Sequence, residues 1–242
     1  MSTHEDLRGV KALMFDFYGT VVDMQGGLTE AVTPFLRERG YEGKPGRLVT
    51  WWRRTHFENS MIDALLHREH TPYREIGRRA VSHTLERAGV PFERADAEAL
   101  VGAIERLDPF PDVIAALTDL HEHYRLVILS NGDPDMLEAG VAHAGFPFDQ
   151  VISVAEANAF KPHVATYRKA AELTGLDPAE ILFVANHAFD CIGTKAFGMR
   201  SAFVDRRGRP FGETPHQPDL VVRDFAELAR VMTSPEVTAA PA

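Results

Sequence analysis

The feature that most constrains the fold of this chain is a series of six short apolar runs rich in β-branched residues. They occupy residues 11–17, 125–130, 151–154, 181–185, 201–205 and 220–222. Each run has the length and composition of a strand buried on both faces. Helical patterns at residues 133–144, 164–174 and 188–197 alternate with the later runs. This alternation predicts an α/β fold built on a parallel, Rossmann-like sheet.

The first apolar run is separated from the others by a long segment with helical character. Amphipathic stretches lie at residues 27–39, 48–67, 73–88 and 95–106. We therefore predict a discontinuous core, residues 1–23 and 108–242, with an inserted helical cap, residues 24–107. The end of the chain from Thr233 combines small residues and prolines without periodicity, so we expect residues 233–242 to be disordered.

Composition limits the class of protein. The 242 residues are 45% apolar, enough for one sizeable core with a smaller insertion. A net charge of -9 argues against nucleic acid or an anionic membrane as the main partner. The N-terminus does not resemble a signal peptide and no run is long enough to span a membrane, so we expect a cytoplasmic protein. The single cysteine, Cys191, excludes an intrachain disulfide.

Polar residues gather where the predicted strands end. Asp16 ends the first run, Ser130 and Asn131 end the second, Lys161 follows the third, and Asp190 follows the fourth. In an open parallel sheet, ligands bind beyond the carboxyl ends of the strands. We expect these groups to face one cleft, where carboxylates, a lysine and a hydroxyl form the kind of constellation found in active sites.

Four motifs in order carry a family resemblance. DFYGT at residues 16–20 is followed by SNG at 130–132, KP at 161–162 and NHAFD at 186–190. This set resembles the haloacid dehalogenase superfamily, and more narrowly the type II L-2-haloacid dehalogenases, over about residues 10–231. The resemblance implies a hydrolase in which Asp16 attacks carbon and forms an ester that water then hydrolyses.

The residue two positions after the nucleophile separates branches of this superfamily. Phosphatases carry a second aspartate there as general acid, whereas this chain has Tyr18. A halide needs no proton to leave, so a dehalogenase can dispense with that acid. Asp190 also lacks the adjacent acid that phosphatases often place in this loop, and Lys161 can balance the charge of Asp16. We therefore predict neither a metal ion nor another cofactor.

The resemblance implies a role for each matching residue. Lys161 would keep Asp16 ionised, Thr20 would help to hold its carboxylate, and Asp190 would orient or activate the hydrolytic water. Ser130 and Asn131 would bind the substrate carboxylate. Arg53, in the cap segment WWRR, would lie on the halide side of the cleft. The other predicted substrate-binding residues are Phe17, Tyr18, Phe57, Tyr167, Asn186, His187 and Phe189.

The preferred interpretation is hydrolysis of short (S)-2-haloacids to (R)-2-hydroxyacids in a compact pocket that favours two- to four-carbon substrates. The partner is a small carboxylate, and a homodimer through the cap would be usual for similar proteins. Type II enzymes have serine and asparagine where this chain has Ala185 and His187, and Arg54 is a third departure. These differences leave the electrophile open. The alternatives are opening of a strained ring such as azetidine-2-carboxylate, with His187 or Tyr18 as proton donor, a phosphatase, and a non-enzymatic binding protein.

Overall fold

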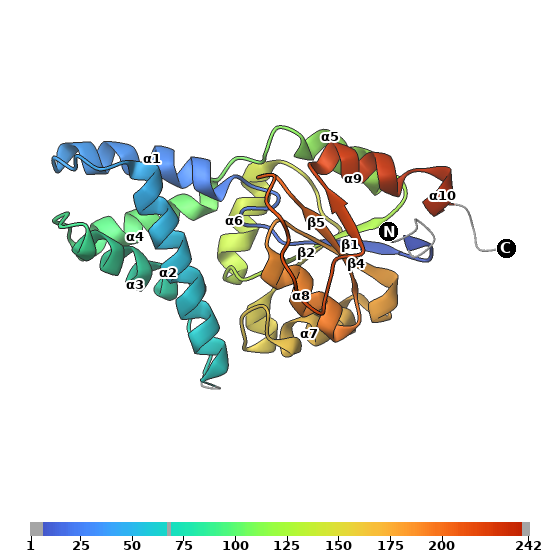
Figure 1. Ribbon diagram of the computed structural model, residues 1–242. Coiled ribbons are helices and arrows are strands. Elements are labelled where there is room, and N and C mark those ends of the chain that lie inside the picture. Colours follow the sequence, from blue (N-terminus) through green and yellow to red (C-terminus); the bar gives the residue numbers. More distant parts are fainter. Residues whose placement is uncertain (1–6, 67–68, 239–242) are drawn as a thin grey trace.

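A six-stranded parallel sheet forms the centre of the molecule (Figure 1). The computed structural model describes residues 7–66 and 69–238. The strands are β1 (Ala12–Phe15), β2 (Arg125–Ser130), β3 (Gln150–Ser153), β4 (Ile181–Ala185), β5 (Arg200–Val204) and β6 (Leu220–Val222). Their order in the sheet is β3-β2-β1-β4-β5-β6, and every neighbouring pair is parallel. The predicted α/β fold is confirmed.

Strand β1 lies at the point where the order of the sheet reverses. Ala12 is in register with Arg125 of β2 on one side and with Ile181 of β4 on the other. All four residues of β1 are completely buried, as their unbroken apolar sequence predicts. A crevice opens beyond such a reversal point in α/β sheets. Residues that directly follow β1 are therefore placed at the natural position for a ligand site.

Helices cover both faces of the sheet. Helices α5 (Val113–His121) and α9 (Phe225–Met232) pack together on one face, and α7 (Val164–Thr174) and α8 (Ala188–Phe197) lie on the other (Figure 1). Helix α6 (Pro134–Ala144) contacts β3 and the short helix η2 (Ala103–Arg106). The short helices η3 (Val154–Ala157) and η4 (Pro178–Glu180) lie in the core connections.

A second group of helices lies beside the carboxyl ends of the strands (Figure 1). It consists of α1 (Met24–Glu38), α2 (Pro45–Leu65), α3 (Tyr73–Arg87), α4 (Arg94–Gly102) and η2. Helix α2 packs against both α1 and α3, and Trp52 of α2 is completely buried. The chain enters and leaves this group through adjacent segments, because the Asp23 amide donates to the Asp108 carbonyl at 2.9 Å. In the part of the chain that the structure describes, no helix is both long and apolar enough to span a membrane.

The C-terminal segment differs from its prediction. Disorder was expected from Thr233, but α10 (Pro235–Thr238) is a short helix whose Val237 side chain is buried. The Arg8 guanidinium donates to the Glu236 carbonyl at 2.9 Å and attaches the segment to the start of the chain. The prediction was therefore wrong for residues 233–238, because one buried apolar side chain and contacts with α9 outweigh the composition. Residues 239–242 of the predicted tail, residues 1–6 of the predicted core and residues 67 and 68 of the predicted cap lie outside the described residues.

Candidate active site

Asp16 follows β1 directly and begins a tight turn. The carbonyl of Phe17 accepts hydrogen bonds from the amides of Thr20, Val21 and Val22. The turn brings the Thr20 hydroxyl back to Asp16, where it donates to Oδ2 at 2.7 Å. Gly19 has a φ of +90°, in the left-handed region that favours glycine. The tight turn thus supplies a donor to a carboxylate that is only 5% exposed.

Lys161 connects Asp16 to a second buried carboxylate. Its Nζ lies 2.8 Å from Asp16 Oδ1 and 3.2 Å from Asp190 Oδ2. All three side chains are buried. The Lys161 amide donates to Asn131 Oδ1 at 3.0 Å, so the loop after β2 helps to place the lysine. A buried charge is tolerated when it is paired, and here one cation serves two acids.

The two carboxylates have opposite pKa shifts. Burial by itself raises the pKa of Asp16, but the neighbouring Lys161 charge and the His187 contact lower it below its ordinary value of 3.8. Burial also raises the pKa of Asp190, to about 6, and the Asp16 charge adds to the increase. Asp16 is therefore ionised near neutral pH, while Asp190 changes charge in a mildly acidic range.

The loop after β4 closes around the same carboxylate. The Asn186 amide donates to Thr20 Oγ1 at 3.0 Å, and its side-chain Nδ2 donates to the Gly19 carbonyl at 2.9 Å. His187 Nδ1 lies 3.1 Å from Asp16 Oδ2. Since an ionised carboxylate only accepts, Nδ1 carries a proton in this contact. Oδ2 of Asp16 thus has two partners, Thr20 and His187, whereas Oδ1 has Lys161.

Asp16 faces a cavity of about 770 Å³ between the core and the cap. The core wall includes Tyr18, and the cap wall includes Arg53 of α2. Arg53 Nη1 donates to Gln25 Oε1 at 3.0 Å, and burial lowers the Arg53 pKa. A methyl group built on Gly19 would lie 3.1 Å from Arg53 Nη2, so the guanidinium approaches the Asp16 turn closely.

Comparisons with known sequences assign this chain to a family. A model of the haloacid dehalogenase-like hydrolase family matches residues 10–198, most of the chain. This chain belongs to that family. The (S)-2-haloacid dehalogenase of Xanthobacter autotrophicus is 39% identical over 199 residues, which cover 81% of this chain and 76% of the relative. Haloacetate dehalogenase H-2 of Moraxella sp. (strain B) is 31% identical, covering 89% of this chain and 95% of the relative.

A solved structure of a family member also agrees. It is the L-2-haloacid dehalogenase from Xanthobacter autotrophicus with chloropropionic acid covalently bound, and it matches with a TM-score of 0.81 at 34% identity. The match covers 92% of this chain and 98% of that chain. The resemblance to the L-2-haloacid dehalogenases drawn from the four motifs is therefore confirmed.

The structure of this haloacid dehalogenase-like hydrolase brings most predicted site residues to the cavity. The predicted residues on its wall are Asp16, Tyr18, Arg53, Phe57, Ser130, Asn131, Asn186, His187 and Phe189. Phe57 of the cap and Phe189 of the core contact each other with ring centroids 4.2 Å apart. Ser130 Oγ is enclosed and has no hydrogen-bond partner among the described residues. Arg54 lies at the rim, where it pairs with Glu58 at 2.8 Å.

Five predicted residues lie behind the cavity wall instead: Phe17, Thr20, Lys161, Tyr167 and Asp190. Thr20, Lys161 and Asp190 belong to the hydrogen-bond network around Asp16. Phe17 and Tyr167 were expected to bind substrate, but both are completely buried. Phe17 packs near Gly140 of α6, and the Tyr167 hydroxyl lies 3.4 Å from Asp190 Oδ1. Both side chains therefore lie in the core rather than on the cavity wall.

The compact pocket expected from the sequence is not what the structure has. The loop that follows β5 contributes Arg206, Arg207 and Arg209 to the outer wall of the cavity. A volume of about 770 Å³ lies in the range of cavities that hold drug-sized ligands. The sequence DRRGRPF at residues 205–211 was a signal for this loop, but it belongs to none of the four motifs.

Asp133 is a second residue that sequence reasoning missed. It was assigned to the start of a helix, where an aspartate usually caps its own helix. Instead its carboxylate accepts from the Tyr73 and Arg74 amides at 2.7 and 2.9 Å, at the start of α3 in the cap. The Tyr73 ring packs against Tyr18, with centroids 5.8 Å apart, and lines the cavity. Asp133, a residue of the core, therefore helps to position Tyr73, a residue of the cap that lines the cavity.

The carboxylates near Asp16 also bear on metal binding. Ligand atoms of Asp16, His187 and Asp190 lie within 4.8 Å of one another, close enough to share an ion. However, the Lys161 ammonium already bonds both carboxylates. Magnesium prefers an octahedron of oxygen ligands, and this set offers one nitrogen and a competing cation. The donor set does not fit magnesium well, so the predicted independence of metal stays our prediction.

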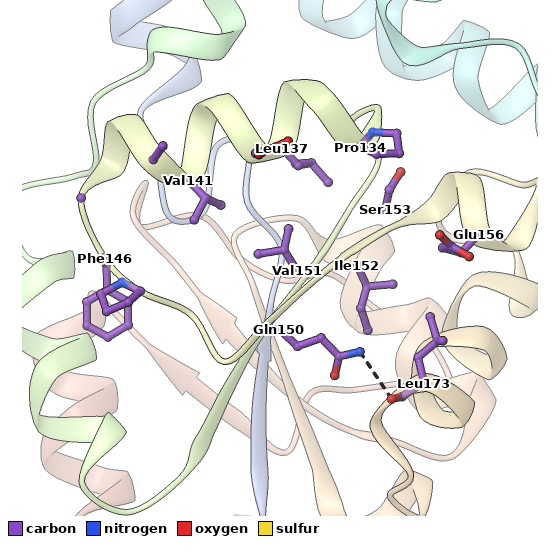
Figure 2. Close-up of a pocket in the computed structure, with 14 residues that line it drawn as sticks. Pro134, Leu137, Val141, Phe146, Gln150, Val151, Ile152, Ser153, Glu156 and Leu173 are labelled. Atoms are coloured by element: carbon purple, nitrogen blue, oxygen red, sulfur yellow. Dashed lines mark hydrogen bonds between the residues drawn. The ribbon is translucent and has the colours of Figure 1, made fainter.

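A second cavity, of about 780 Å³, lies beside the edge strand β3 (Figure 2). Its wall is formed mainly by apolar side chains of α6 and β3, including Leu137, Val141 and Val151, which point into it in Figure 2. Gln150 at its floor donates to the Leu173 carbonyl at 3.4 Å. None of the predicted site residues lines this hollow. It lacks the convergent charges of the Asp16 cavity and offers no comparable chemistry.

Proposed function

We propose that this protein is an (S)-2-haloacid dehalogenase that acts through an aspartyl ester on a 2-substituted carboxylate. One observation carries the proposal: Asp16, ionised by its contact with Lys161, faces a cavity in which Tyr18 replaces the general acid of a phosphatase. Relatives named (S)-2-haloacid dehalogenase and haloacetate dehalogenase support the class of substrate. A relative's structure that holds chloropropionic acid covalently supports the ester route.

The first step forms the ester. Asp16 Oδ1 keeps an unshared electron pair because Lys161 is its one partner, whereas Oδ2 accepts from both Thr20 and His187. Oδ1 attacks C2 of the substrate, the new C–O bond forms, and the halide leaves with the C–X electron pair. Attack from the face opposite the halide inverts C2. Lys161 and Thr20 hold the carboxylate in position for this attack.

The substrate is held by groups that approach Asp16 from two sides. The Ser130 hydroxyl, enclosed and without a partner in the described residues, supplies a donor for a carboxylate oxygen. Asn131 lines the same wall. Arg53 approaches from the cap and stabilises the departing halide. In this arrangement the substrate carboxylate lies at the loop after β2 and the halide lies near α2.

The second step hydrolyses the ester. Water attacks Cγ of Asp16, the bond between Cγ and Oδ1 breaks, and the 2-hydroxyacid leaves with Oδ1, while the oxygen of the water stays in the Asp16 carboxylate. Asp190, ionised above its pKa of about 6, accepts the proton of the water directly or through a second water. The sum is substrate plus water giving hydroxyacid, halide and a proton. The ring-opening alternative receives no support from the relatives, which are named for haloacids and haloacetate.

A single-turnover reaction in heavy-oxygen water tests the route. With the protein in excess over (S)-2-chloropropionate, we expect the label in the Asp16 carboxylate and none in the first lactate released. Mass spectrometry of the peptide that contains Asp16 measures this. The Asp16→Asn variant should lose halide release by roughly 1,000-fold or more, while Asp135→Asn, at an exposed position, keeps it. Label found in the lactate of the first turnover contradicts the covalent route.

A further inference from the structure

The outer wall of the Asp16 cavity carries positive charge that the proposed reaction does not use. Five arginines line the cavity: Arg53 and Arg54 from the cap, and Arg206, Arg207 and Arg209 from the loop after β5. Two of them are neutralised, because Arg54 pairs with Glu58 and Arg206 pairs with Asp112 at 2.8 Å. This concentration is unusual in a chain with a net charge of -9.

Arg207 and Arg209 are left without a partner. Neither guanidinium has an ion pair or a hydrogen bond with any residue in 7–66 or 69–238. The acids that line the cavity in those ranges are Asp16 and Asp23. Asp16 is bonded to Lys161, and Asp23 Oδ1 accepts from the Gly26 amide as the cap of α1. No lining acid is therefore available to balance these two arginines.

Arg207 and Arg53 line the same cavity, one from the loop after β5 and the other from α2 of the cap. Burial lowers the Arg53 pKa, and the positive charge of Arg207 lowers it further, so the two guanidinium groups repel each other. Like charges are held near each other at a cost, and an anion between them removes that cost. Arg206 fixes the base of the loop, because it bonds Asp112 and donates to the Thr20 carbonyl at 3.3 Å. The position of Arg207 is thus tied to the turn that carries Asp16.

We propose that Arg207 forms a second anion subsite at the outer wall, so that the substrate is a 2-substituted acid with a second carboxylate on its side chain. This inference rests on the proposed function. The first carboxylate binds at Ser130 and Asn131, C2 lies over Asp16, and the side chain extends towards Arg207. The cavity volume of about 770 Å³ leaves room for this longer chain. Bond formation and cleavage at C2 are the same as for a monocarboxylate.

Paired substrates of equal chain length test the subsite. We compare (S)-2-chloroglutarate with (S)-2-chloropentanoate, which carries a methyl group where the second carboxylate would be. Halide release should give the wild-type protein a higher kcat/KM for the dicarboxylate. Arg207→Gln should lower that value by about 10- to 100-fold, the effect of losing a charge-assisted hydrogen bond. It should leave kcat/KM for chloropentanoate within about twofold, and Arg207→Lys should restore part of the preference.

Arg37→Gln is the matched control, because Arg37 is exposed on α1 and does not line the cavity. This variant should leave kcat/KM for both substrates unchanged. If Arg207→Gln lowers kcat/KM equally for both substrates, Arg207 only attracts anions in general and the subsite is refuted. If it changes neither, the subsite is also refuted. If the wild-type protein releases halide from neither acid, nor from (S)-2-chloropropionate, the proposed function itself fails, so the two failures are distinguishable.

Discussion

At the scale of single residues, the buried Lys161 ammonium lies between two carboxylates that respond to it differently. Asp16 is bonded at 2.8 Å and Asp190 at 3.2 Å, and Asp16 also accepts from Thr20 and His187. Hydrogen bonds to the charged form lower a carboxyl pKa, whereas burial raises it. With more donors around it, Asp16 stays ionised, while Asp190 keeps a pKa of about 6. This difference in pKa supports the proposed roles of Asp16 as the nucleophile and of Asp190 as the base.

The raised pKa of Asp190 predicts a pH-dependent stability. Between its ordinary value of 3.8 and about 6, the folded protein binds this proton more tightly than the unfolded chain. The stability that Asp190 contributes is present below about pH 4 and is lost as the pH rises through 6. Asp16 acts in the opposite sense, because its pKa is lowered: its contribution is present above 3.8 and is lost at lower pH.

Asp190→Asn removes the ionisation. We expect the free energy of unfolding of the variant, relative to wild type, to increase between pH 4.5 and 6.5, on the order of 2 kcal/mol. Urea unfolding at several pH values within that range measures the difference. Asp135→Asn, which changes an exposed acid with a lowered pKa, should show no such increase. A difference between Asp190→Asn and wild type that is constant over this range would contradict the prediction.

At the scale of secondary-structure elements, the start of α3 depends on a residue from the core. The first amides of a helix have no partner within the helix, and those of Tyr73 and Arg74 donate to Asp133. Asp133 is buried, so these bonds are protected from water. The same loop carries Ser130 and Asn131, which we expect to bind the substrate carboxylate. Asp133 thus links the position of the cap to the substrate loop.

Asp133→Ala should weaken this link. We expect a loss of about 2 kcal/mol in the free energy of unfolding, because two amides lose a charged acceptor. Hydrogen exchange of the first amides of α3 should become faster. Asp135→Ala is the matched control: Asp135 bonds the Arg74 side chain at 2.9 Å, but the pair is exposed and worth less than about 1 kcal/mol. Equal losses in the two variants would show that Asp133 has no special role.

At the scale of the whole molecule, positive charge is concentrated at Asp16 and along its cavity. The Lys161 ammonium bonds both Asp16 and Asp190, and arginines of the cap and of the loop after β5 line the cavity. An acidic protein can in this way attract an anionic substrate through a local field. The homodimer through the cap stays a prediction.

This arrangement predicts activity without divalent ions. Dialysis against a chelator followed by a halide-release assay should leave the rate within about twofold of the untreated protein. Added magnesium should not raise it, because the ion would have to displace Lys161 from two carboxylates. A rate that falls on chelation and returns with magnesium would contradict the assignment of Lys161 as the compensating cation. The metal content of the purified protein, measured by mass spectrometry, is the control.

The fold and the centre of the site were predictable because they depend on local patterns. Each strand of the sheet is an unbroken apolar run, and the carboxyl ends of parallel strands meet at one edge, so Asp16, Ser130 and Lys161 could be grouped from their positions alone. Phe17 and Tyr167 were placed less well, because proximity in sequence does not tell which way a side chain points. The size of the cavity was missed for the same kind of reason, since a loop remote in sequence completes it.

The sequence by itself determined that Asp16 ends a buried strand, that Tyr18 follows it where an acid would make a phosphatase, and that a helical segment interrupts the sheet. The strand and the helical insertion follow from residue type and periodicity, whereas the significance of Tyr18 follows from the family resemblance. Only the tertiary structure decided that Asp133 caps a helix of the cap rather than its own, and that Arg207 lines the same cavity as Arg53. Such contacts join residues far apart in the chain, and packing rather than local propensity selects them.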